Sequence, residues 1–68
     1  MKQTKNLHSL IGERGVAICT LRPSGFVMIK GEVYDSEGTR PWIIEEGSNV
    51  LVIGVVMNRF LQVKEIGV

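Results

Sequence analysis

Short β-patterned runs joined by brief turns constrain the fold of this chain more than any other feature. The clearest turn is at residues 21–25, between an apolar run at 15–20 and another at 26–29. Pro23 presets φ for the first corner of a turn, and Gly25 is able to take the left-handed conformation that closes it. Two β-patterned runs with so short a connection predict an antiparallel hairpin.

The first run has apolar residues at both of its alternating sets of positions. One set is Val16, Ile18 and Thr20, and the other is Ala17, Cys19 and Leu21. A strand that is apolar on both faces is typical of a central position in a sheet. A second turn at 30–32 leads into a third strand at 33–36, so the first three strands are expected to form a meander in sequence order.

The second half of the chain predicts two further strands, at 49–57 and 60–66, joined by a tight turn. Gly54 lies inside the first of them, where a glycine commonly marks a bulge. Residues 37–41 break the β pattern, and we expect a loop there because Pro41 lacks an N–H.

No segment of this 68-residue chain shows helical periodicity, so no helix is available to cover a flat sheet. Five strands that curl into a small barrel bury their inward side chains and leave few free edges. We therefore expect an all-β, five-stranded antiparallel barrel, with an oligonucleotide/oligosaccharide-binding (OB) or an SH3-like topology. The barrel is expected over 9–66, after a flexible arm or linker remnant at 1–8.

Composition argues against several classes of function. Eight Lys and Arg residues against seven Asp and Glu residues give a net charge of +1. So small a net charge gives the chain no overall electrostatic attraction to nucleic acid or to an anionic membrane. The longest apolar run, 50–57, is far below the ~20 residues of a spanning helix, so a membrane is expected only through a parent protein or a partner. Cys19 is the single cysteine and His8 the single histidine, so we expect no metal site.

Catalysis is not expected either. The serines lie in turn positions, as Ser24 and Ser48 illustrate, and Glu45 and Glu46 read as a solvated pair rather than as two catalytic acids. Without a nucleophile and base, paired acids or a metal site, we predict neither an enzyme nor a cofactor, and no small-molecule substrate.

The chain also resembles the C-terminal soluble domain of NfeD-like proteins, from about Ser9 to Val63. The resemblance is carried by the segments 9–17 (SLIGERGVA), 20–25 (TLRPSG), 29–32 (IKGE), 34–35 (YD) and 43–50 (IIEEGSNV), and by Asn58, Arg59, Leu61 and Val63. The combination of LRPSG with the upstream LIG and the downstream YD is its most specific part. Residues 37–43 depart from the family pattern.

This resemblance implies an OB-type Greek-key barrel without the usual covering helix. It also implies a domain carried by membrane proteins that work with stomatin/prohibitin-like scaffolds. The single free cysteine, Cys19, favours a reducing compartment, so we expect this domain on the cytoplasmic side. Some longer members of the family carry a serine protease domain, which is not found in these 68 residues. We therefore interpret the chain as an excised domain or an unusually short relative.

Apolar residues at strand positions that are expected to face solvent favour a function in protein interaction. If Val27 and Ile29 face inward, several apolar residues are left outside, where such a domain is expected to carry polar ones. The hypothesis is a surface that binds a scaffold protein, another copy or the remainder of a parent protein. Its candidate residues are Phe26, Met28, Val33, Trp42, Leu51 and Val56.

Single-stranded nucleic-acid binding is the alternative, because many OB-type barrels stack bases on aromatic side chains in a basic groove. The aromatic residues are few, and the nearest cations are interleaved with acids. These residues are Phe26, Tyr34, Trp42 and Phe60, and Arg22, Lys30, Arg40 and Arg59. We therefore place this alternative second.

Overall fold

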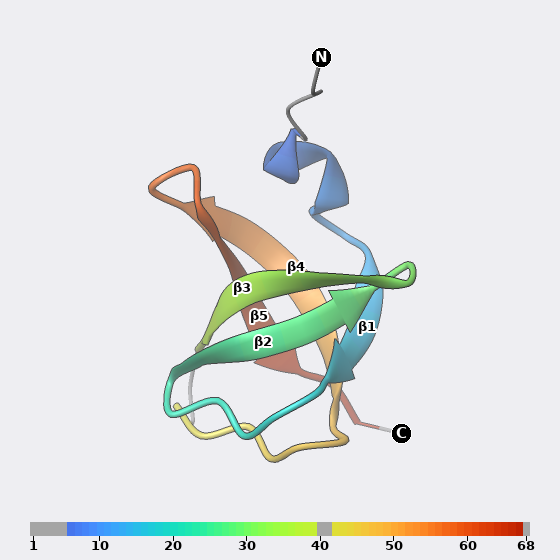
Figure 1. The fold of residues 1–68 in the computed structure, drawn as a ribbon, viewed down its shortest axis with the longest axis vertical. Helices are drawn as coiled ribbons and strands as arrows, with labels where there is room; N and C mark the ends of the chain where they lie inside the picture. The colour runs from blue at the N-terminus through green and yellow to red at the C-terminus, as the bar shows by residue number, and fades with distance from the viewer. Residues whose placement is uncertain (1–5, 40–41, 68) are drawn as a thin grey trace.

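The computed structural model describes residues 6–39 and 42–67. They form one short 3-10 helix followed by five strands, which Figure 1 shows wrapped around a common interior. The elements are η1 (Leu7–Leu10), β1 (Arg14–Ala17), β2 (Ser24–Ile29), β3 (Glu32–Gly38), β4 (Asn49–Val56) and β5 (Phe60–Glu65). The five strands and their order confirm the expected all-β architecture.

The strands close into a barrel in the order β1-β2-β3-β5-β4, and β1 returns to pair with β4. The expected meander of the first three strands is confirmed. The strand pairs β1–β2, β2–β3, β4–β5 and β1–β4 are antiparallel, whereas β3 and β5 run parallel from Ser36↔Leu61 to Gly38↔Val63. This closed order is the OB-type topology, and the parallel pair refines the antiparallel barrel that the sequence predicted.

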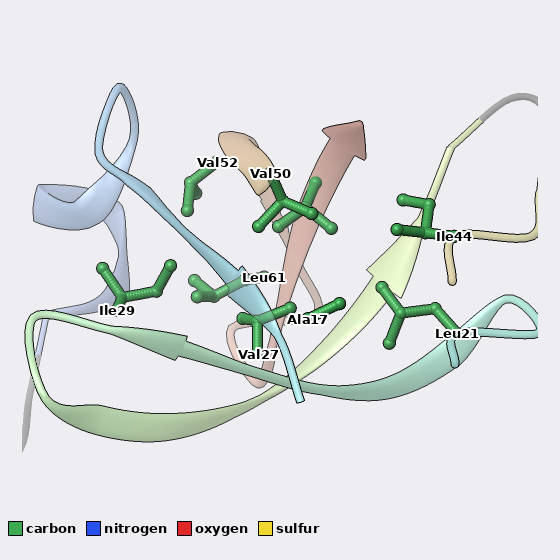
Figure 2. Close-up of a cluster of buried hydrophobic side chains, with 9 residues drawn as sticks. Ala17, Leu21, Val27, Ile29, Ile44, Val50, Val52 and Leu61 are labelled. Atoms are coloured by element: carbon green, nitrogen blue, oxygen red, sulfur yellow. The ribbon is translucent and has the colours of Figure 1, made fainter. Parts of the chain in front are cut away.

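Nine apolar side chains of the described residues fill the interior, and Figure 2 shows them converging from the strands and from the connections that carry Leu21 and Ile44. They are Ala17, Leu21, Val27, Ile29, Ile44, Val50, Val52, Leu61 and Val63, each at most 1% exposed. The hydroxyl of Ser36, the buried polar residue among those described, donates a 3.4 Å hydrogen bond to the Tyr34 carbonyl oxygen and is thereby satisfied.

The first strand is shorter than the sequence predicted, since β1 ends at Ala17. Gly25 does not have the left-handed conformation expected of it and lies within β2. A Cβ atom at this position would overlap Leu21 Cδ2 and lie 2.9 Å from Cys19 Sγ. The glycine therefore lets β2 approach the loop that precedes it, and the turn between the strands is longer than expected because Leu21 forms a bridge to Ile44.

Two other turns do use left-handed backbone conformations. Lys30 and Gly31, with φ of 52° and 81°, connect β2 to β3, and positive φ at both central residues is the type I′ arrangement that suits a hairpin. Met57 and Asn58 have φ of 53° and 57° between β4 and β5. The bulge expected at Gly54 is confirmed by the register shift between Val52 and Gly54.

The third strand is longer than expected. β3 continues through Gly38, so Glu37 and Gly38 belong to the strand and not to the predicted loop. Both residues pair with β5 on one side, and Glu37 also pairs with Ser24 of β2. Long-range pairing on two sides holds this segment extended, which local sequence does not reveal. Arg40 and Pro41 lie outside the described residues.

The short helix η1 covers part of the barrel. Residues 1–5 of the predicted arm lie outside the described residues, Asn6 is the N-cap of η1, and Leu7 and His8 belong to this helix. The Asn6 side chain accepts a hydrogen bond from the His8 N–H, which caps this short helix. Leu7 and Leu10 pack against the core, and the element with which η1 makes most of its contacts is β4. No helix in the described part of the chain is long and apolar enough to cross a membrane.

Candidate interaction surface

An apolar row crosses the outer face of three neighbouring strands. Val16 of β1 is paired with Met28 of β2, and Met28 is paired with Val33 of β3. Alternation along each strand turns these side chains away from the interior. Their exposed fractions are 39%, 39% and 53%. The pairing therefore places three exposed apolar side chains next to one another.

A second row extends this apolar area. The Ile18 N–H donates a 3.1 Å hydrogen bond to the Phe26 carbonyl oxygen, which continues the β1–β2 contact beyond the end of β1. Ile18 is 38% exposed and Phe26 is 46% exposed. We call the five residues of the two rows the outer sheet patch: Val16, Ile18, Phe26, Met28 and Val33.

Charged residues border the outer sheet patch. Arg14 precedes Val16 by two positions on β1 and shares its outward face, whereas Asp35 is paired with Phe26 at the opposite end. Lys30 Nζ lies 3.2 Å from Glu13 Oε2, so these two charges compensate each other near the Arg14 end. The border therefore has a basic corner and an acidic corner.

Trp42 lies away from the strands, in the connection between β3 and β4. Its φ is 78°, a left-handed value that is rare for so bulky a residue, and its N–H donates a 2.7 Å hydrogen bond to the Thr39 carbonyl oxygen. Trp42 is 53% exposed and Ile43 is 48% exposed. The next residue, Ile44, is fully buried and bridges to Leu21, which fixes the connection to the barrel. We call Trp42 and Ile43 the end loop.

The other two candidate residues lie apart from these areas. Leu51 is half-buried on β4, where it is paired with Arg14 of β1, so β1 separates it from Met28 and Val33. Val56 is half-buried at the end of β4 and is paired with Phe60. Of the six candidate residues, the structure thus brings Phe26, Met28 and Val33 together. It leaves the remaining three at separate places.

Val16 and Ile18 were not among the predicted candidates. Both were assigned to a central strand that is apolar on both faces, and in the structure their side chains on the outer face of the barrel are 39% and 38% exposed. The alternation of Val16 and Ile18 with the buried Ala17 was the signal available in the sequence. Ile43 was missed because nothing in a loop indicates which side chain points outward.

The described residues present little reactive chemistry. No group of three or more His, Cys, Asp or Glu residues within 6–39 and 42–67 is placed to hold a metal ion. Cys19 is half-buried, packs against the core and accepts a 3.3 Å hydrogen bond from the Phe26 N–H through Sγ. Arg22 and Glu37 form no ion pair within the described segments.

Comparison with known proteins identifies the fold. No protein-family model matches the sequence, and no curated protein matches it. Among solved structures, the chain is similar to the C-terminal domain of stomatin operon partner protein 1510-C from Pyrococcus horikoshii, with a TM-score of 0.82 and 24% sequence identity. The match covers 97% of this chain and 100% of that domain. The fold expected from the NfeD resemblance is therefore confirmed: this chain has the fold of the C-terminal domain of a stomatin operon partner protein.

Proposed function

We propose that this chain is a non-catalytic protein-interaction domain that contacts a stomatin/prohibitin-like scaffold through the end loop. The observation that carries this proposal is the exposure of Trp42 on a backbone held in a left-handed conformation. Such backbone strain persists where the surrounding structure enforces it, and it is concentrated at functional sites. Tryptophan is also among the residues that dominate binding energy at protein interfaces.

The class of partner is supported by the fold. The solved domain that this chain resembles belongs to a protein named as a stomatin operon partner. In the proposal, the domain lies on the cytoplasmic side of a membrane, to which a parent protein or the scaffold itself ties it. The exposed pair Trp42 and Ile43 provides the apolar contact, and the buried Ile44 anchors that pair on the barrel.

The composition of the exposed surface favours a protein partner over single-stranded nucleic acid. Phe26 is the one aromatic residue of the outer sheet patch, and Asp35 borders it directly. Glu37 lies two residues farther along β3. Carboxylates beside the stacking position repel the phosphate backbone, whereas a nucleic-acid groove is lined by cations.

The scaffold contact is tested by binding to an immobilised stomatin-like scaffold protein from the same organism. Trp42→Ala is expected to weaken binding at least ~10-fold, which corresponds to loss of an interface anchor. The matched control is Ile53→Ala, because Ile53 is also exposed, at 40%, but lies on β4. Unchanged affinity of the Trp42 variant, or no binding of the wild-type chain at high micromolar concentration, overturns the proposal.

The nucleic-acid alternative has its own measurement. Short single-stranded oligonucleotides are titrated at low salt, where phosphate contacts are strongest, and the fluorescence of Trp42 is recorded. We expect no saturable change up to high micromolar concentration. A saturable, salt-sensitive response would favour the nucleic-acid function over the scaffold contact.

A further inference from the structure

We propose that the outer sheet patch is the contact surface between two copies of this chain, which associate face to face about a two-fold axis. This contact is separate from the end loop, so it goes beyond the proposed scaffold binding. Five exposed apolar side chains on neighbouring backbone segments form a continuous area, unlike the scattered single apolar residues of ordinary monomer surfaces. A symmetric dimer uses the same surface of both copies, which therefore has to be complementary to itself.

The charges around the patch meet this condition. Arg14 lies at one corner and Asp35 at the diagonally opposite corner, with Met28 on the middle strand between them. They are separated by two strand spacings of ~4.8 Å and about four residues at ~3.3 Å each, so by roughly 16 Å along the face. The Glu13 carboxylate compensates the nearby Lys30, which leaves Arg14 as the net charge of its corner.

Neither of the two corner charges is neutralised by another described residue of its own copy. Arg14 and Asp35 have no ion-pair partner among the described residues. A two-fold axis in the plane of the contact, passing Met28, places Arg14 of each copy against Asp35 of the other. The same operation places Met28 on Met28 and brings Val16 close to Phe26, so apolar contacts fill the centre.

The opposite charges at the two corners favour a second copy of this chain as the partner that binds the outer sheet patch. A partner with a single sign of charge would satisfy one corner and oppose the other, whereas a second copy satisfies both at once. The net charge of +1 adds little repulsion between copies. A contact centred on five apolar side chains of each copy is at the small end of protein interfaces, so we expect association at concentrations of roughly 10 µM to 1 mM.

Charge reversal provides the test, measured by sedimentation velocity across that concentration range. The wild-type chain is expected to shift from monomer toward dimer. Arg14→Glu alone and Asp35→Arg alone place like charges together in both contacts and are expected to stay monomeric. An equimolar mixture of the two variants is expected to form heterodimers, because each new glutamate then meets a new arginine and the native pair forms at the other contact.

Three controls make the outcome decisive. Arg59→Glu reverses an exposed charge on the β4–β5 turn and is expected to dimerise as the wild type does. Circular dichroism and thermal unfolding verify that each variant is folded. Scaffold binding, which depends on the end loop, is expected to be unchanged in Arg14→Glu, so failure of either proposal is recognised independently of the other.

Several results overturn the dimer. They are a wild-type chain that remains monomeric at about 1 mM, a single charge-reversal variant that dimerises as the wild type does, and a mixture that fails to associate. Dissociation of the dimer on addition of the scaffold protein also contradicts the proposed dimer contact, because the scaffold would then bind at the outer sheet patch.

Discussion

The inner and outer faces of β2 carry similar side chains but have different roles. Val27 and Ile29 are fully buried, whereas Phe26 and Met28, on the same strand, are 46% and 39% exposed. The inner pair is required for folding, because it fills the barrel and removes apolar area from water. The outer pair is not needed to close the barrel. Its apolar character is therefore available for association with another molecule.

The largest difference between the two faces is expected from truncation of Ile29. Ile29→Ala removes a fully buried side chain and leaves a cavity, so we expect the free energy of unfolding to fall by about 3 kcal/mol. Urea denaturation followed by circular dichroism measures this loss. Met28→Ala, the neighbouring outward residue, is the control and is expected to cost less than about 1 kcal/mol. Equal losses at the two positions would contradict the distinction.

The second prediction concerns Gly15 of β1, whose backbone lies against Ile29 on the inner face of β2. A Cβ atom at Gly15 would overlap Ile29 Cδ1 and the Met28 carbonyl oxygen, and the carbonyl cannot move without shifting β2. Gly15→Ala is expected to destabilise the barrel by about 2 kcal/mol, the usual scale of overpacking. Gly67→Ala is the matched control, because nothing lies within 4 Å of its Cβ position. Thermal unfolding of both variants tests this, and a stable Gly15 variant would contradict the close approach.

Replacing Met28 by serine tests whether the outer face of β2 stabilises the dimer rather than the folded monomer. Because Met28 lies at the centre of the proposed dimer, Met28→Ser is expected to raise the dimer dissociation constant ~10-fold, about 1.4 kcal/mol. The monomer is expected to lose no more than about 1 kcal/mol of stability, as is usual for an exposed position. Sedimentation measures the first quantity and urea denaturation the second. If the variant loses stability and still dimerises as the wild type does, Met28 supports the fold and not the association of two copies.

The smallest effect is expected at the ion pair beside the outer sheet patch. Lys30 and Glu13 are largely solvent-accessible, with 65% and 37% of their side chains exposed, so water and salt screen their attraction. Glu13→Gln is expected to change the free energy of unfolding by at most about 0.5 kcal/mol. Denaturation at low and high salt provides the check, and a loss above about 1 kcal/mol would show that this outer pair supports the fold.

The amino-acid sequence predicts the structure best where neighbouring residues decide the backbone conformation. The period-two alternation of 26–29 predicted which residues of β2 face inward, and the glycines at 31 and 54 predicted a turn and a bulge. Each of these features depends on the conformational range of one residue or on the alternation of adjacent side chains. The resemblance to a known family then selected the OB-type topology between two candidate barrels.

The errors arose where distant segments meet. Gly25 was assigned to a left-handed turn, although it is a glycine because Leu21 and Cys19 approach its backbone. Glu37 was assigned to a loop, although pairing with Ser24 and Gln62 keeps it in β3. A local pattern does not report which segment, many residues away, will lie beside a given backbone.

The sequence by itself determined that the chain would form short strands with apolar inner faces, because alternation and turn residues act locally. Tertiary structure alone decided which outward residues share a surface. It paired Met28 with Val16 and Val33 through strand register, and it left Trp42 in a separate end loop. The physical reason is that barrel closure fixes the neighbours of every strand, and the neighbours determine whether exposed apolar residues lie apart or form one continuous patch.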